Sequence, residues 1–567
     1  MSLASKFRLF AGLFALSVPA TLHGAVKLPS IFGDHMVLQQ GAALPVWGTA
    51  DPGEKVSVSL GPDHTTATAD ASGKWKVILA PLPASATPTT LVVTEKTTLT
   101  FTDVLVGEVW LCSGQSNMEF NLHRELHGAE TLASAHESEI RLFLAPHITS
   151  LQPKDDFPAS KDVLGKWVIC TPEVLAPDWG NGFSGYSAVS FYFGRELHQV
   201  LKQPVGLIDD YFGGTPAEAW TSLSGLQKEP SLQHFADEHN QLVANFARAT
   251  AEMPAKTAAY QSALTAWETK GGHAYEEEMA KWKVISDQAN LAGKVAPPRP
   301  SPPSPKPTPP MPDGGWTMPT NLYNGMLEPV IPYAIRGAIW YQGENNVEHA
   351  GEYGTIFPRM IRDWREKWGQ GDFPFLFVQL PAFKLSPLLT WPLMRESQAK
   401  ALALPNTGMV TAIDLGNPTQ LHPVDKLDVG KRLAALARHQ VYGEDIPARG
   451  PAYASMQIQD NAIRISFAPD AGELVIGRSP WVAPGVTPPP LDRLVDFIIA
   501  GADHKWFHAD AHIDGNAVMV SSPQVPAPVA VRYDWANCPQ GNLYNRAGWP
   551  AFPFRTDNWP DTGAINN

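Results

Sequence analysis

Short apolar runs recur through the middle of the chain, and each is too short to form a helix. They fall at residues 104–111, 141–144, 205–208, 335–341, 375–380 and 409–413. Runs of this length are typical of strands that are buried on both faces. Between them, residues such as Val189, Phe193 and Leu197 repeat at helical spacing. The alternation predicts an α/β fold in which a mainly parallel sheet is flanked by helices.

The two ends of the chain have a different, strand-like pattern. Val56, Val58 and Leu60 alternate with polar residues, and turn-forming residues follow at 70–73. Short alternating strands joined by such turns are typical of a small β-sandwich. After residue 443, strand-like runs and turn signals return, so we expect a second β-rich domain there.

Between residues 226 and 320 the alternation of strands and helices is interrupted. Apolar residues at helical spacing lead into a proline-dense tract at 297–312, which cannot continue a helix or a central strand. We expect an inserted helical hairpin whose return leg is extended and largely polyproline-like. The pattern leaves two placements open, at the rim of an active site or on the surface as a plain insertion.

The first 25 residues are typical of a secretory signal. Lys6 and Arg8 precede an apolar run at 9–18 that is too short to span a bilayer, and small residues follow at 20–25. We expect an exported protein, periplasmic or extracellular, without a membrane span. The patterns together divide the chain into a signal peptide (1–25), an N-terminal β-domain (26–102), an α/β domain in two parts (103–225 and 321–443) around the insertion (226–320), and a C-terminal β-rich domain (444–567).

Composition narrows the range of partners. The 567 residues carry a formal net charge of −13 and no basic stripe, which argues against nucleic acid as a partner. Cys112, Cys170 and Cys538 are too few for a disulfide framework, although one bridge is compatible with them, and they lack the paired spacing of a zinc site. None of these features indicates an oligomeric state.

Ser116 is the first candidate for chemistry, because it follows the apolar run at 104–111. Ligands of open α/β sheets bind at the carboxyl ends of the strands, and a serine there can expose its hydroxyl beside backbone N–H groups. A serine after a strand more commonly caps the next helix. The local sequence alone therefore favours the capping role.

Further polar residues follow other predicted strands. Gly214 comes after the run at 205–208, and Gln342 and Asn346 come after the run at 335–341. Glycine N–H groups and side-chain amides are neutral donors that suit a developing oxyanion. His422 follows the last predicted strand and so falls at the same edge as Ser116, where an imidazole can make a serine nucleophilic.

The motifs that carry these residues resemble a known superfamily. GQSNM at 114–118, GGTPAEAW at 213–220, WYQGENN at 340–346 and HP at 422–423 occur in the order typical of SGNH hydrolases. Within that superfamily the chain resembles the sialate O-acetylesterase-like carbohydrate acetylesterases. The similarity extends over nearly the whole mature chain, including segments 31–40, 45–54, 321–333, 531–539 and 542–557.

The resemblance implies a three-layer α/β/α catalytic domain of flavodoxin-like type, with accessory elements, that removes acetyl groups from sugar hydroxyls. It assigns Ser116 as nucleophile and His422 as general base and acid. It builds the oxyanion hole from the N–H groups of Ser116 and Gly214 and a side-chain amide, for which we favour Gln342 over Asn346. It implies neither a metal nor an organic cofactor.

One position departs from the superfamily pattern. An aspartate usually stands two or three residues before the histidine, whereas this chain has Thr419 and Gln420. In a protease triad, replacing that acid by its amide lowers turnover about 10,000-fold. Gln420, a backbone carbonyl or a distant carboxylate such as Asp414 remains open as the group that orients His422. Since an acetyl ester is easier to cleave than an amide, our hypothesis is a Ser-His dyad supported by Gln420.

The resemblance implies an acetylated oligosaccharide or polysaccharide as substrate. The acidic chain favours uncharged plant cell-wall polymers such as xyloglucan or xylan over anionic O-acetylated sialic acids, which remain the alternative. A non-catalytic glycan-binding protein is a more distant alternative, because the residues that would carry hydrolysis are intact. Transfer of the acetyl group to another sugar is also more distant, because no membrane span is expected.

Overall fold

The central sheet is built from the short apolar runs. In the computed structural model, which describes residues 25–160, 162–177, 185–384, 390–479 and 481–560, its strand order is β13-β12-β11-β7-β10-β8-β9. Neighbouring strands run parallel except β9, which is antiparallel to β8. The bounds are β7 (Thr98–Gly114), β8 (Glu137–Leu144), β9 (Trp167–Cys170), β10 (Val205–Tyr211), β11 (Gly337–Tyr341), β12 (Phe375–Gln379) and β13 (Thr407–Thr411). The predicted mainly parallel sheet is confirmed.

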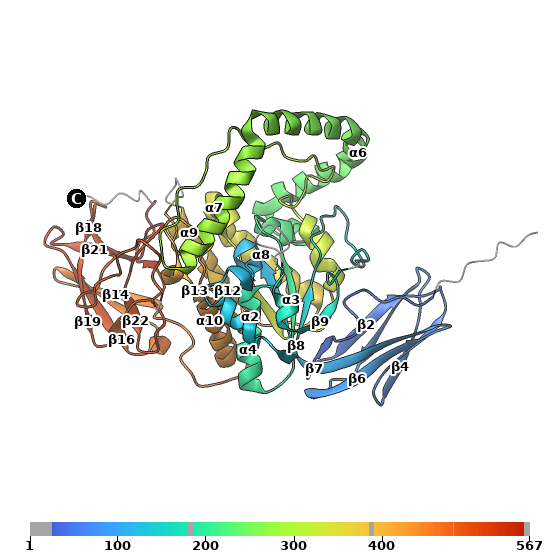
Figure 1. Cartoon of the computed structure of the whole chain (residues 1–567). Helices are drawn as coiled ribbons and strands as arrows, with labels where there is room; N and C mark the ends of the chain where they lie inside the picture. The colour runs from blue at the N-terminus through green and yellow to red at the C-terminus, as the bar shows by residue number, and fades with distance from the viewer. Residues whose placement is uncertain (1–24, 161, 178–184, 385–389, 480, 561–567) are drawn as a thin grey trace, which may run out of the picture.

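Helices cover both faces of this sheet (Figure 1). On one face, Phe193 of α4 (Ala188–Leu201) packs on Trp110, and α10 (Leu427–Gln440) lies beside α4. On the other face, Trp364 of α8 (Ala350–Trp368) packs on Trp340. Trp110 is level with Gly337, three residues before Trp340, so the two indoles point to opposite faces. Helix α9 (Trp391–Ala399) packs beside α8.

The carboxyl ends of the central strands are level with one another. Gly114, the last residue of β7, pairs with Tyr211 at the end of β10 and with Tyr341 at the end of β11. The loops that follow these strands therefore start at the same height on the same edge. This register is what brings the predicted site segments together.

The N-terminal β-domain shares a strand with the central sheet. The first part of β7 pairs with β6, while its second part pairs with β10 and β11. Asp103, at the predicted boundary, lies inside β7 with a φ of 53°. The other strands of this domain are β1 (Val37–Gln39), β2 (Leu44–Thr49), β3 (Lys55–Leu60), β4 (Asp63–Thr68), β5 (Lys74–Leu79) and β6 (Ser85–Thr94). Their buried residues belong to the same hydrophobic core as the central sheet.

The segment between the two parts of the α/β domain forms an arch over the sheet edge (Figure 1). Helix α6 (Gln233–Trp267) continues through a π-helical turn at Glu268–Gly272 into α7 (His273–Leu291). The proline-rich return leg has no regular secondary structure and accepts hydrogen bonds from two indoles, Trp267 Nε1 to the Ser304 carbonyl and Trp282 Nε1 to the Pro297 carbonyl. Helices with an extended return leg match the prediction.

The C-terminal region forms antiparallel sheets with a hydrophobic core of their own. Arg395 of α9 donates to the carbonyls of Ala536 and Asn537, and Glu396 binds Arg555, so this region docks against α9 at the β12–β13 side of the central sheet. The strands are β14 (Tyr453–Gln459), β15 (Ala462–Phe467), β16 (Leu474–Ile476), β17 (Phe497–Gly501), β18 (Trp506–His508), β19 (Asp510–Asp514), β20 (Ala517–Ser521), β21 (Pro528–Tyr533), β22 (Leu543–Asn545) and β23 (Phe554–Arg555).

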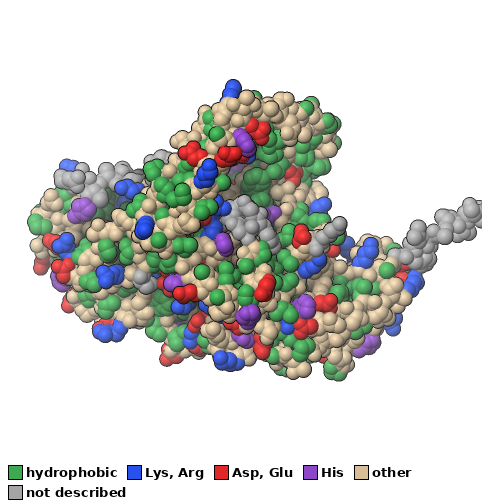
Figure 2. All heavy atoms as spheres, in the orientation of Figure 1, with side chains coloured by type: hydrophobic (Ala, Val, Ile, Leu, Met, Phe, Trp, Pro, Cys, Tyr) green, Lys and Arg blue, Asp and Glu red, His purple; other side chains and the backbone are tan. Residues whose placement is uncertain are grey.

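Several sequence-based expectations concern the surface and the termini. On the face shown in Figure 2, Lys and Arg side chains are scattered among acidic ones, and the surface is recessed beneath the arch. Cys112, Cys170 and Cys538 are free thiols, so the bridge that the sequence left open is not formed. Among the described helices, none combines the length and the apolar character that a membrane span needs. The predicted signal peptide lies, except for Ala25, outside the described residues.

Candidate active site

Ser116 lies where β7 turns into a short helix. The turn is tight because Gly114 has a φ of 140°, and a Cβ there would lie 2.3 Å from the Tyr341 carbonyl oxygen. Helix α1 (Ser116–Glu119) starts at Ser116, and its N-cap is Gln115. Ser116 is therefore the first residue inside the helix rather than its cap, which sets the capping alternative aside.

His422 comes to Ser116 from the loop between β13 and α10. Its Nε2 lies 2.8 Å from Ser116 Oγ, which is a hydrogen-bond distance. Burial lowers the pKa of His422 to about 3, and the positive charges of Lys426 and Arg124 act in the same direction. The imidazole is consequently neutral near pH 7 and can accept a proton from Ser116.

The two side chains face a cavity of about 430 Å³ at the carboxyl edge of the sheet. Its walls come from the loops after β7, β8, β10, β11 and β13. The described lining residues are Gln115, Ser116, Glu119, His147, Phe212, Gly213, Gly214, Glu344, Asn345, Leu421 and His422. The cavity thus brings together residues as far apart in sequence as Ser116 and His422, which are separated by 306 positions, as the predicted sheet edge requires.

The backbone donors expected for an oxyanion lie at this cavity. Ser116 is the first residue of α1, where a backbone N–H has no acceptor within the helix. Gly214 has a φ of 71°, a conformation that favours glycine, and a Cβ there would meet open space. The sequence placed both residues correctly at the edge.

The side-chain amide is not the one that the sequence favoured. Gln342 is fully buried and donates through Nε2 to the Thr215 carbonyl (3.1 Å) and to Asn346 Oδ1 (2.7 Å). Asn346 donates in turn to Glu218 Oε2 at 2.9 Å. These two amides hold the loops after β10 and β11 together behind the cavity wall.

Asn345 is the side chain of this block that lines the cavity. It is exposed, and its Nδ2 donates to the Gly214 carbonyl at 3.0 Å, which leaves the second N–H of the same amide for a ligand. Adjacent residues of the short helix η7 (Glu344–His349) point in different directions. The sequence could not separate Asn345 from its neighbours, because that choice depends on the loop conformation.

A buried polar network lies behind Ser116 and His422. Asn117 donates to Glu344 Oε1 (2.5 Å) and to the Leu421 carbonyl (3.2 Å), and it accepts from Lys426 Nζ at 2.6 Å. Burial raises the pKa of Glu344 and lowers that of Lys426 to about 7. Glu344 anchors its loop, as expected, whereas the partners Asn117 and Lys426 were not predicted.

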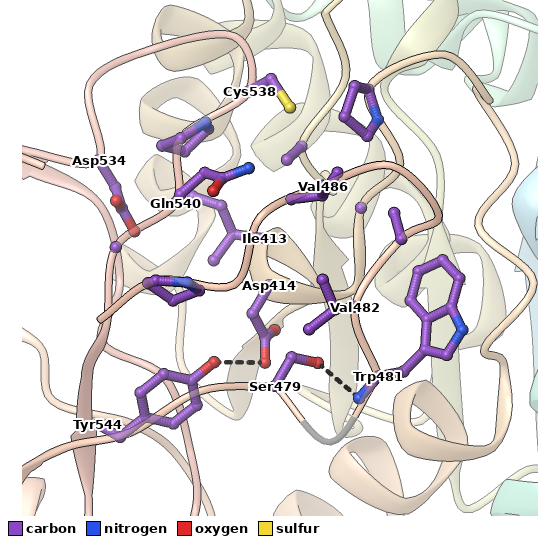
Figure 3. Close-up of a pocket in the computed structure, with 17 residues that line it drawn as sticks. Ile413, Asp414, Ser479, Trp481, Val482, Val486, Asp534, Cys538, Gln540 and Tyr544 are labelled. Carbon is purple, nitrogen blue, oxygen red and sulfur yellow. Dashed lines mark hydrogen bonds between the residues drawn. The ribbon is translucent and has the colours of Figure 1, made fainter. Parts of the chain in front are cut away.

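Of the two side chains considered for orienting His422, that of Asp414 is engaged elsewhere. The Asp414 carboxylate binds Arg432 at 2.6 and 2.8 Å. It also accepts from the Tyr544 hydroxyl at 3.0 Å, as Figure 3 shows. The backbone N–H of Gln420 donates to Asn417 Oδ1 at 3.1 Å. Asp414 is drawn away because it follows β13 on the side that faces α10 and the C-terminal region.

A second pair of titratable side chains lines the cavity and was not predicted. Glu119 is only 2% exposed and accepts from the Gly213 N–H at 2.6 Å; burial raises its pKa to about 8. Burial lowers the pKa of His147 to about 4, and its ring stacks on Phe212. Glu119 is three residues after Ser116 on α1, a spacing that places both on one helix face and was the available signal.

The insertion reaches the site in two places. Asp287 of α7 binds the Arg124 guanidinium through two contacts of 2.9 and 3.1 Å. The positive charge of Arg124 in turn helps to lower the pKa of His422. Trp316, near the end of the insertion, stacks on Phe212 with ring centroids 5.7 Å apart. The insertion therefore borders the site, which answers the question that the sequence left open.

The polar side chains at the cavity determine which chemistry the site suits. Among the residues that the structure describes, there is no group of three or more His, Cys, Asp or Glu side chains placed to hold a metal ion. The polar groups at the cavity are a serine, two histidines, two carboxyls and amides. They suit acyl transfer by nucleophilic attack and proton transfer.

Comparisons with known proteins agree with this chemistry. Residues 312–438 match the family model described as carbohydrate esterase, sialic acid-specific acetylesterase. Sialate O-acetylesterase from Rattus norvegicus is 28% identical over 572 residues, 93% of this chain and 94% of that protein. The enzyme of the same name from Mus musculus is 29% identical over 459 residues, 75% of each chain.

A solved structure covers the chain almost completely. A carbohydrate acetylesterase from Xanthomonas citri is 33% identical, covers 94% of this chain and 100% of its own, and superimposes with a TM-score of 0.72. Fold and comparisons together define a carboxylic ester hydrolase that acts on acetylated carbohydrate. The chain belongs to the sialate O-acetylesterase-like family of carbohydrate acetylesterases, which confirms the resemblance seen in its motifs.

Proposed function

We propose that the chain removes acetyl groups from sugar hydroxyls with Ser116 as nucleophile and His422 as general base and acid. The observation that carries this proposal is the 2.8 Å distance between Ser116 Oγ and His422 Nε2 at the wall of the cavity. A neutral imidazole is needed for the first proton transfer, and the lowered pKa of His422 supplies it.

The reaction proceeds in two steps. Ser116 Oγ attacks the acetyl carbonyl while His422 Nε2 takes the hydroxyl proton, and the N–H groups of Ser116 and Gly214 with the Asn345 amide hold the oxyanion. The tetrahedral intermediate collapses, the C–O bond to the sugar breaks, and His422 returns the proton to the sugar oxygen. Water, deprotonated by His422, then attacks the acyl-enzyme and releases acetate.

The domain organisation is part of the same proposal. The catalytic unit is an SGNH-type α/β/α domain of residues 103–225 and 321–443, interrupted by residues 226–320. Residues 26–102 and 444–567 are accessory β-rich domains. Residues 1–25 direct export to the periplasm or the extracellular space, which fits the polymeric substrates proposed below.

An uncharged acetylated polysaccharide such as xyloglucan or xylan is the substrate that the cavity supports best. The described lining residues include the carboxyl groups of Glu119 and Glu344 and contain neither Lys nor Arg. A sialic acid ester would bring a carboxylate to this wall without a cationic partner at the lining, which is costly. The formal net charge of −13 acts in the same direction.

O-acetylated sialic acid is the second candidate. The family description and the names of the mammalian relatives favour it. Release of acetate from acetylated xyloglucan, acetylated xylan and O-acetylated sialic acid, measured in parallel on the purified protein, separates the two. Faster release from the sialic acid ester would overturn the preference for uncharged sugars.

Ser116→Ala tests the mechanism. We expect hydrolysis of an aryl acetate and of acetylated xyloglucan to disappear while the thermal unfolding midpoint stays near that of the wild type. A folded variant that still releases acetate would refute the assignment of Ser116 as nucleophile.

A further inference from the structure

A carboxyl group stands next to Ser116 in the cavity and has no role in the two-step reaction. Glu119 lies one helical turn after Ser116 on α1, and its Oε2 accepts the Gly213 N–H at 2.6 Å. A Cβ built on Gly213 would lie 2.9 Å from Glu119 Oε2 and 3.3 Å from Ser116 Cβ. The carboxyl and the serine therefore flank the same glycine, within reach of one bound sugar.

The other oxygen of Glu119 has no hydrogen bond in the described structure. Glu119 Oε1 lies 3.8 Å from His147 Nε2, which is beyond hydrogen-bond distance. A carboxyl whose Oε2 accepts a backbone N–H can carry its proton on Oε1 and donate it to a ligand in the cavity. Glu119 is thus a donor of the kind that a sugar oxygen accepts.

The groups around Glu119 leave it without a compensating cation. His147, after β8, and Tyr211, in β10, face it. Desolvation lowers the pKa of His147, although 32% of its side chain is exposed, and burial raises the pKa of Tyr211 well above its usual value. The Tyr211 hydroxyl donates to the Gly185 carbonyl at 2.6 Å. Burial alone raises the pKa of Glu119 to about 8, against the lowering effect of the Gly213 hydrogen bond. The carboxyl is therefore mostly protonated near pH 7.

An aromatic stack lies beside this donor. The rings of His147 and Phe212 are stacked with centroids 4.0 Å apart and planes at 10°, and both line the cavity. Trp316 extends the stack behind Phe212. Aromatic faces next to a few placed polar groups are the usual means of holding a ring-shaped ligand that is apolar on its faces and polar at its edges.

We propose that Glu119 determines specificity by donating a hydrogen bond to an oxygen of an uncharged sugar whose ring lies against the exposed side of the His147–Phe212 stack. The proposal rests on the proposed function, since the ester attacked by Ser116 belongs to that sugar. It names the ligand class as a hydroxyl-rich, uncharged pyranoside. An ionised Glu119 has no proton to donate, so recognition of the sugar weakens when the carboxyl loses its proton.

The test compares a substrate that has a sugar with one that lacks it. For the wild type, kcat/KM is measured between pH 6 and 9 on an acetylated xylo-oligosaccharide and on 4-nitrophenyl acetate, with enzyme-free blanks at each pH. The ratio of the two values should fall several-fold as the pH rises through about 8. Loss of one hydrogen bond to substrate corresponds to a limit of roughly tenfold.

Two substitutions at Glu119 sharpen the test. In Glu119→Gln the amide donates at every pH, so the ratio should no longer change with pH. In Glu119→Ala the ratio should be about tenfold below the neutral-pH value of the wild type at every pH. If Glu119 only positioned the Gly213 loop, both substrates would be affected equally and the ratio would stay constant, which would overturn the proposal.

His147→Phe is the matched control, because it keeps an aromatic ring and removes the second titratable group. The fall of the ratio near pH 8 should persist in this variant; its disappearance would assign the titration to His147 and refute the role of Glu119. Failure of the underlying function has a different signature, since a folded Ser116→Ala that cleaves both substrates would remove the serine mechanism whatever the ratio does.

Discussion

Two buried polar clusters flank the segment that follows β13, and they differ in how charge is handled. In the cluster at Asp414, the carboxylate is bound by Arg432 and the Tyr544 hydroxyl, and nearby acidic groups raise the pKa of Arg432 above its usual value. In the cluster at His422, burial shifts pKa values toward the neutral forms of His422 and Glu119. Removing one partner of a buried charge pair destabilises a fold, whereas neutral titratable groups facing a cavity are candidates for proton exchange.

Removing the imidazole should produce the largest effect on activity. His422→Ala removes the group that takes the Ser116 proton, and we expect kcat to fall about 10,000-fold or more. The side chain lies at the cavity, so the thermal unfolding midpoint should change little. Steady-state hydrolysis of an aryl acetate and a thermal melt check both statements. A fall of less than tenfold would mean that another base serves Ser116.

The cluster at Asp414 should show the opposite behaviour. Arg432 and Asp414 are only 4% and 5% exposed at their side chains, and Arg432→Met leaves the carboxylate buried without its charge partner. We expect a loss of about 3–5 kcal/mol in the free energy of unfolding, measured with urea.

Asp414→Asn sharpens the contrast between stability and catalysis. This variant should be destabilised but retain its kcat per folded molecule, because the Asp414 carboxylate is committed to Arg432 and Tyr544. Activity lost in a variant that remains folded would contradict this and return Asp414 to the role of orienting His422.

The choice between neighbouring amides is tested by two alanine variants. Asn345→Ala removes the cavity-facing donor, and we expect kcat to fall about 100-fold or more with stability unchanged. Gln342→Ala removes bonds between two loops and should lower the unfolding midpoint. If both variants lost activity and stability to the same extent, Asn345 and Gln342 would not have the separate roles of cavity donor and loop support.

The smallest expected effect is on the acidic side of the pH profile. With a His422 pKa of about 3, kcat/KM for an aryl acetate should fall less than twofold between pH 7 and pH 5. An ordinary imidazole with a pKa near 6.5 would produce a loss of about 25-fold. A decline with an apparent pKa near 6.5 would show that His422 is not shifted in the working enzyme.

The same shift affects stability, and its sign can be stated. The unfolded chain binds a proton at His422 below about pH 6.5, whereas the folded chain does so only below about pH 3. The unfolded state therefore holds more protons between these values, and the contribution of His422 to stability increases as the pH rises through that window. Urea unfolding of the wild type and of His422→Ala at pH 4 and pH 7 measures the difference.

The sequence predicted what depends on periodicity and on motif. Burial on both faces identified the strands, and the parallel register then placed Ser116, Gly214 and His422 at one edge. It did not separate Asn345 from Gln342, because neighbouring residues of a short turn face different ways and only tertiary contacts decide which one meets the cavity. It left Asp414 open as a group that orients His422 for a similar reason, since the contacts of Asp414 with Arg432 and Tyr544 are tertiary.

Glu119 and His147 were missed because their places in the fold, rather than their residue types, make them notable. A glutamate after a motif and a histidine in a loop are ordinary surface residues in a sequence. Their pKa shifts arise from the walls that five loops build around them. The i, i+3 relation between Ser116 and Glu119 was the single local clue.

The continuous strand β7 makes the N-terminal domain a fixed extension of the catalytic scaffold. A strand of 17 residues, roughly 56 Å long, belongs at one end to the accessory sheet and at the other to the turn that presents Ser116. The domain cannot swing on a linker, as appended modules often do. Removing the domain would truncate β7, the strand whose carboxyl end leads to Ser116. Transplanting this domain to another enzyme would therefore require rebuilding that enzyme's central sheet.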